Sequence, residues 1–162
     1  MTATSSDAAK VTLPTDDQIL IVREFDAPRR LVYQAWTTAD LVKRWWSGQR
    51  GEVTIAELDL RVGGTWRYVM TANAGFEVGF HGEYREIVPE ERIVYTEVFE
   101  GMPDVGGALN TATFADVDGR TKLTLHSQCP SQAVRDAIIE SGMEGGMQEQ
   151  MDALEQTAIS LR

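Results

Sequence analysis

The chain has 162 residues, of which 43% are hydrophobic and 25% are charged, and its formal net charge is −10. A chain of this size forms one domain and buries roughly 70% of its unfolded surface without crosslinks. The negative charge argues against nucleic acid and an anionic membrane surface as partners, because both are bound mainly through Lys and Arg.

The N-terminal part of the chain predicts a tail followed by one strand. Residues 1–15 are rich in Ser, Thr, Ala and Asp and have no periodicity, so we expect a mobile tail there. The domain is then expected to span residues 16–162. Within it, residues 19–25 form a short apolar run that predicts the first strand.

Two short amphipathic helices are expected next. Asp26 and Pro28 supply a side-chain cap and a preset backbone angle for the first helix. Thr37 and Asp40 resemble a capping box, which predicts the start of the second helix.

The middle of the chain has the period of two that is typical of strands. Turn residues separate the apolar runs, and Asp118-Gly119 is a strong hairpin signal. The expected strands are residues 53–60, 65–71, 76–88, 92–100, 108–117 and 120–127.

From Ser131 onward the apolar period returns to that of a helix. We expect one long C-terminal helix whose middle is weakened by Gly142, Gly145 and Gly146, as a kink or as a close approach to the sheet. Hairpin succession predicts an antiparallel sheet, and only this helix is long enough to cover one of its faces. The expected fold class is α+β, a curved sheet of about six to seven strands around the long C-terminal helix.

Several segments, in chain order, resemble the START-like (SRPBCC) superfamily, in the branch named after the activator of heat-shock protein 90 ATPase homologues. The matching segments are residues 26–37, 45–46, 59–67, 82–87, 89–96 and 142–147. The resemblance implies a helix-grip (Bet v 1-like) fold with a cavity between the sheet and the long helix. Members of the superfamily include lipid and hormone binders, aromatic cyclases and proteins of unknown role.

Strand alternation selects candidate side chains for that cavity. Aromatic and Met side chains suit an adaptable apolar pocket, although the same residues in the same pattern also fill an ordinary core. The candidates are Trp66, Tyr68, Met70, Phe80, Tyr95, Glu97, Phe99, Met143, Met147 and Met151.

Glu97 is the sharpest individual candidate, because it shares the expected apolar face with Tyr95 and Phe99. The resemblance implies an aromatic residue at this position. A buried carboxyl has a raised pKa and can bind a polar ligand group or move a proton. The alternatives are a bulge that turns Glu97 to solvent or an ion pair with an Arg such as Arg67.

The remaining chemistry-bearing residues predict no further site. His81 and His126 have no partner at metal-ligand spacing, so neither a metal nor a cofactor is expected. Cys129 is the single cysteine, which excludes an intrachain disulfide and is typical of a reducing compartment. With no signal peptide or membrane-spanning run in view, a cytoplasmic location is expected.

Three functions remain open at this stage. The favoured one is binding of a small hydrophobic or aromatic molecule without catalysis. The second is a protein-interaction module, for example one linked to chaperones, with Trp45 and Trp46 as the place to look for an exposed patch. The third is a cyclase-like or hydrolase-like enzyme using Glu97, His81 or Tyr68. A homodimer formed through an exposed strand edge is also possible.

Overall fold

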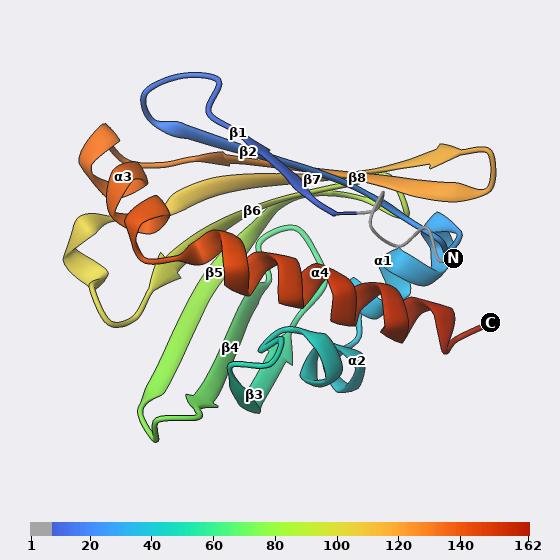
Figure 1. Ribbon diagram of the computed structural model, residues 1–162, viewed down its shortest axis with the longest axis horizontal. Helices are drawn as coiled ribbons and strands as arrows, with labels where there is room; N and C mark the ends of the chain where they lie inside the picture. Colours follow the sequence, from blue (N-terminus) through green and yellow to red (C-terminus); the bar gives the residue numbers. More distant parts are fainter. Residues whose placement is uncertain (1–7) are drawn as a thin grey trace.

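The structure is a computed structural model that describes residues 8–162 (Figure 1). Its elements are β1 (Lys10–Thr12), β2 (Gln18–Phe25), α1 (Arg29–Thr37), α2 (Ala39–Trp45), β3 (Gly51–Leu58), β4 (Thr65–Ala72), β5 (Glu77–Val88), β6 (Arg92–Phe99), the 3-10 turn η2 (Pro103–Val105), β7 (Ala108–Val117), β8 (Arg120–Gln128), α3 (Gln132–Glu140) and α4 (Met143–Ile159).

The strands form one antiparallel sheet in the order β1-β2-β8-β7-β6-β5-β4-β3. Strands β3 to β7 each pair with the next strand in the chain, whereas β2, near the N-terminus, pairs antiparallel with β8, toward the C-terminus. The α+β class and the helix-covered sheet are therefore confirmed, with eight strands in place of six to seven. The sheet ends at β1 and β3, and the predicted homodimer through such an edge stays a prediction.

The extra strand comes from the segment that the sequence predicts to be a tail. Val11 of β1 lies opposite Ile21 of β2, so β1 covers an edge that β2 would otherwise expose. The Gln148 side chain on α4 bonds both the backbone N–H and the carbonyl of Ala9, at 3.0 and 2.7 Å. The prediction of a mobile tail is wrong for residues 10–12, while residues 1–7 lie outside the described residues.

The helices begin where expected, but their predicted caps are not formed. Pro28 occupies the N-cap of α1, and neither α1 nor α2 has a side-chain cap hydrogen bond. The Thr37 hydroxyl instead donates to the Tyr33 carbonyl at 2.7 Å, inside α1. Asp26 is exposed and faces Arg162, with Asp26 Oδ1 and Arg162 Nη2 3.8 Å apart.

The predicted single C-terminal helix is two helices. The backbone angle φ of Gly142 is +83°, a left-handed conformation that interrupts a helix and favours glycine. Gly145 and Gly146 lie inside α4 without breaking it. A Cβ added at Gly146 would have no neighbour within 4 Å, so the predicted close approach to the sheet is absent there.

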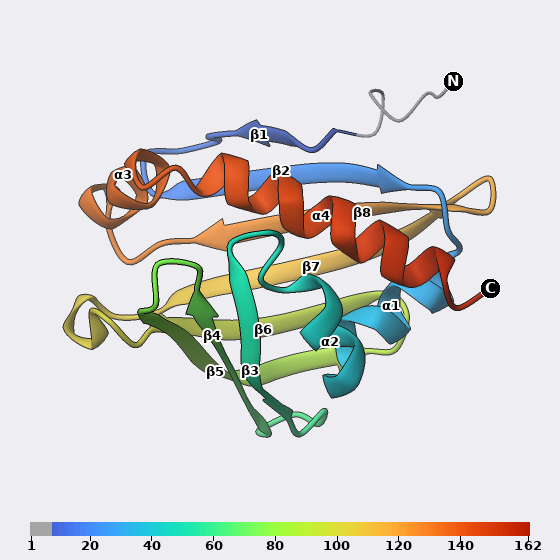
Figure 2. The same ribbon diagram turned by 60° about the horizontal axis from the view of Figure 1, so that its bottom comes forward.

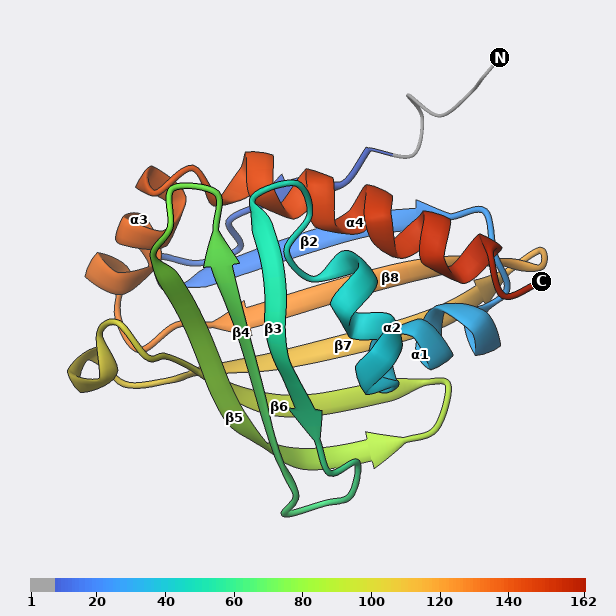
Figure 3. The ribbon, with the colours of Figure 1, turned by 90° about the horizontal axis from the view of Figure 1, so that it is seen from below.

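The sheet curves around α4, which lies across its concave face (Figures 1 and 2). Register shifts occur in β3 between Val53 and Ile55 and in β5 between Tyr84 and Glu86, and such bulges bend a strand. As a result β3 and β4 cross the direction of β7 and β8 (Figure 3). Helices α1 and α2 pack against α4, and they close one end of the concave space.

Candidate functional site

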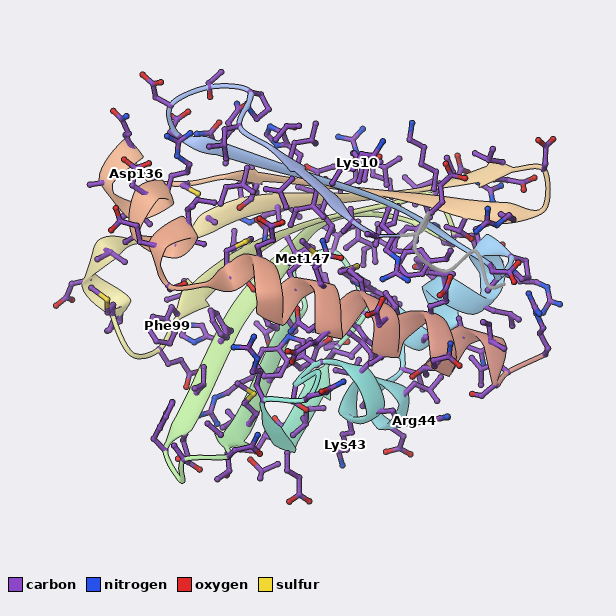
Figure 4. All side chains as sticks on the ribbon, viewed as in Figure 1. Lys10, Lys43, Arg44, Phe99, Asp136 and Met147 are labelled. Carbon is purple, nitrogen blue, oxygen red and sulfur yellow. The ribbon has the colours of Figure 1, made fainter. Side chains whose placement is uncertain are left out.

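Solvent access to the concave space increases from one end to the other. Along β6 the inward-facing residues change from fully buried Ile93, through half-buried Tyr95 and Glu97, to Phe99, which is 37% exposed. Along α4 burial falls in the same direction, from Leu154 to half-buried Met143. The interior is thus packed near α1, and its side chains become more exposed where β6 ends and α4 begins, on the side where Figure 4 labels Phe99.

A continuous series of aromatic rings lines one wall of this space. Phe99 at the more exposed end lies 5.1 Å from Phe80, measured between ring centroids. Phe80 contacts Trp46 at 5.8 Å, and Trp46 contacts Tyr68 at 5.7 Å. Trp66 continues the series, 4.9 Å from Tyr68 and 5.8 Å from Tyr95. The wall offers large, rigid apolar surface from the more exposed end to the centre of the sheet.

One polar pair interrupts this apolar interior. Register places Tyr95 opposite Asn110 and Asn110 opposite Ser127, so these side chains share the concave face with Glu97. The Asn110 amide nitrogen donates to Glu97 Oε1 at 3.0 Å. Asn110 is only 8% exposed, and within the described residues its Oδ1 has no hydrogen-bond partner. A buried carbonyl oxygen without a partner is uncommon and indicates a position for another polar group.

Burial shifts the pKa of Glu97 and of two nearby tyrosines. Burial raises the pKa of the Glu97 carboxyl, and the Asn110 bond opposes that shift. Burial likewise raises the pKa of Tyr95, and it raises that of Tyr84 to about 12. The phenols therefore stay neutral at neutral pH and act as hydrogen-bonding groups.

The structure brings most of the predicted cavity residues to the concave side. Trp66, Tyr68, Met147 and Met151 are buried there, and Met70, Phe80, Tyr95, Glu97 and Met143 are half-buried. Glu97 bonds Asn110, so neither predicted alternative, a turn to solvent or an ion pair with Arg67, is found. Whether these residues bind a ligand stays a prediction.

Sequence reasoning missed three residues of the concave side: Trp46 in the aromatic wall, Asn110 in the polar pair, and buried Tyr84, which lies opposite Tyr95. Asn110 follows Ala108 and precedes Ala112 on the same strand face, and a lone polar residue in that alternation was the available signal. Trp46 lies just after α2 and is 9% exposed, and Trp45 is 4% exposed. The patch considered at Trp45 and Trp46 is therefore not on the surface.

A second cluster lies on the convex face of the sheet. Arg67 holds Glu100 through two hydrogen bonds of 2.8 and 3.0 Å, and His81 Nδ1 lies 2.9 Å from Glu100 Oε2. The Arg67 bond lowers the pKa of Glu100 to about 2. A hollow of about 270 Å³ adjoins the cluster, lined by Glu57, Thr65, Trp66, Arg67, His81 and Gly82. His81 therefore does not converge with Glu97 and Tyr68, as acid–base catalysis by the three would require.

In residues 8–162, no three His, Cys, Asp or Glu side chains are grouped so as to hold a metal ion. No helix in that range combines the length and apolarity required to cross a membrane. Cys129 is buried, and burial raises the pKa of its thiol, so it is not an activated nucleophile.

Comparison with known proteins identifies relatives by family and by fold. Residues 26–158 match the family described as activator of Hsp90 ATPase homolog 1-like protein. No curated protein matches the chain in sequence. A crystal structure of a protein from Rhodobacter sphaeroides superposes with a TM-score of 0.87 at 23% identity, over 95% of this chain and 99% of that one. A Chromobacterium violaceum protein superposes at 0.74 with 28% identity, over 86% and 95%. A Mycobacterium smegmatis protein superposes at 0.83 with 22% identity, over 92% and 95%.

Proposed function

The chain belongs to the activator of Hsp90 ATPase homolog 1-like family, and from that premise we propose that it binds a small, mainly apolar or aromatic molecule between the sheet and α4. The START-like fold of this family is a ligand-binding type of fold. The observation that carries the proposal is the buried Asn110 Oδ1, which has no hydrogen-bond partner among residues 8–162 and lies beside Glu97 at the inner end of an aromatic wall.

The layout of polar and apolar groups supports this function. Ligand sites are mostly apolar, with a small number of placed polar groups that fix orientation. Here the wall from Phe99 to Trp66 supplies the apolar surface, and Glu97 with Asn110 supplies the polar anchor. Tyr95 and Glu97 are half-buried, so the Glu97 side of the anchor keeps partial solvent access while Asn110 lies deeper.

Two matched variants on β7 test the location. The side chain of Ala108 lies on the concave face opposite Glu97, whereas Leu109 points to the convex face and is 43% exposed. Ala108→Trp is expected to obstruct the more exposed end of the concave space and abolish binding, and Leu109→Trp is the control that adds the same ring outside. Native mass spectrometry of fresh protein, followed by calorimetric titration with 2-naphthol, measures both. Equal binding by the two variants, or no binding by the wild type, contradicts the proposal.

The two other functions have less support. An interaction module requires an exposed apolar patch, and the one considered at Trp45 and Trp46 is buried. An enzyme requires convergent acid–base groups, and His81 lies with Glu100 away from Glu97. The cytoplasmic location and the absence of nucleic-acid and membrane partners stay predictions.

A further inference from the structure

The polar pair also constrains the chemistry of the ligand, on the condition that the proposed binding site is correct. The Asn110 amide nitrogen donates to Glu97 Oε1 at 3.0 Å, so the nitrogen side of the amide points toward the carboxyl. This orientation turns Asn110 Oδ1 away from Glu97. Asn110 Oδ1 is therefore available as an acceptor, and the second oxygen of Glu97 is an acceptor in the ionised form of the carboxyl.

The charges around the pair also disfavour a ligand that carries a carboxylate. Burial raises the pKa of Glu97 and the Asn110 bond opposes this shift. No cation among the described residues contributes to it. Arg67, the cation considered for Glu97, is held by Glu100 on the convex face. A ligand carboxylate would meet the Asn110 acceptor and, when Glu97 is ionised, a like charge, which is costly at a largely buried position.

We infer that the bound molecule presents a neutral or cationic hydrogen-bond donor, such as a phenolic hydroxyl or an amine, to Asn110 Oδ1 and Glu97, and that carboxylates of the same shape are rejected. The donor would satisfy the one buried side-chain oxygen that the described residues leave without a partner. The aromatic wall would hold the apolar remainder of the molecule.

Three probes of nearly equal shape separate donor recognition from apolar binding. They are 2-naphthol, which carries a donor, 2-methoxynaphthalene, which carries only an acceptor, and 2-naphthoate, which carries a charge. Calorimetric titration at neutral pH measures each dissociation constant. We expect 2-naphthol to bind about tenfold more tightly than 2-methoxynaphthalene, and 2-naphthoate to bind at least about a hundredfold more weakly than 2-naphthol.

Variants assign the selectivity to the pair. Glu97→Gln introduces an amide donor at nearly constant shape, and it is expected to reduce the preference for 2-naphthol and to restore binding of 2-naphthoate. Asn110→Leu is expected to remove the preference for 2-naphthol. Glu100→Gln removes a carboxylate on the convex face and serves as the control, with the wild-type order of affinities retained.

The possible results distinguish this inference from the proposed function. Equal affinity for the three probes, or a preference for 2-methoxynaphthalene, overturns the inference and leaves ligand binding in place. Selectivity that persists in Glu97→Gln and Asn110→Leu overturns its assignment to the pair. Absence of binding by all three probes contradicts both the inference and the proposed function.

Discussion

The attachment of α4 to the sheet provides a stability prediction with a magnitude. Arg23 points inward from β2, and its side chain is 2% exposed. Its guanidinium contacts Glu155 Oε1 at 3.1 Å and Asp152 Oδ1 at 2.6 Å. Glu155 is 8% exposed at its side chain and also accepts the Asp26 backbone N–H at 2.8 Å. This group of contacts fixes the helix that covers the proposed site.

The perturbation is Arg23→Met, which keeps an apolar stem but removes the charge. It leaves the Glu155 carboxylate buried without its cation, and breaking a buried pair in this way costs about 3–5 kcal/mol. Because domains are stable by about 5–15 kcal/mol, the loss is a large part of the total. At about 2–4 °C per kcal/mol for this chain length, the melting temperature is expected to fall by about 6–20 °C.

Two further variants show which partner matters. The Asp152 side chain is 71% exposed, so Asp152→Asn is expected to cost about 0.2–1 kcal/mol despite its shorter contact. Arg23→Met combined with Glu155→Leu removes both buried charges and is expected to recover most of the loss, because water can replace Glu155 at exposed Asp26.

The assay is urea unfolding followed by tryptophan fluorescence at neutral pH. The reasoning is refuted if Arg23→Met costs less than about 1 kcal/mol, or if Asp152→Asn costs as much as Arg23→Met.

Three further predictions concern Glu97, Gly146 and Gly82. The pKa of Glu97 is raised above its ordinary 4.5, so the native state holds its proton more tightly and this residue lowers stability as pH rises through that window. Unfolding free energies are expected to match for Glu97→Gln and wild type below about pH 4.5 and to favour the variant toward pH 7; a difference independent of pH contradicts this. Gly146→Ala adds a Cβ inside α4 that has no neighbour within 4 Å. Thermal unfolding should show a gain of about 0.5–1 kcal/mol in the free energy of unfolding. A loss of stability would reveal a contact that the structure lacks. Gly82→Ala places a Cβ 1.8 Å from the Thr96 carbonyl oxygen. Denaturant unfolding should therefore show a loss of at least about 2 kcal/mol in the free energy of unfolding. An unchanged free energy would mean that β5 and β6 separate easily at this point.

Local sequence patterns predicted much of the fold. The alternation of Trp66 with Tyr68, and of Tyr95 with Glu97, places each pair on one strand face regardless of the rest of the chain, since successive side chains point to opposite faces. The Asp118-Gly119 hairpin formed as predicted, with φ values of +54° and +82°. These features depend on a few neighbouring residues, which a sequence shows directly.

Local patterns failed where a competing contact decided the outcome. Thr37 has the chemistry of a helix cap, but its hydroxyl bonds the Tyr33 carbonyl inside α1. Residues 10–12 have no strand pattern, yet they pair with β2 because β2 would otherwise be an open edge. In both places the local propensity is weak, and a nearby hydrogen-bonding group supplies the deciding contact.

The class of fold, the order of its elements and the choice of Glu97 as a candidate follow from periodicity and residue type, which are visible in the chain before it folds. The contact between Glu97 and Asn110 is different, because it exists only in the folded sheet. Their contact depends on the register of β6 against β7, and a shift of one residue would turn Asn110 to the convex face. The same holds for the rise in exposure toward Phe99, because the sheet curves around α4 and because α1 and α2 pack against α4 at the other end. Long-range pairing and curvature arise from contacts among distant residues, which no local pattern contains.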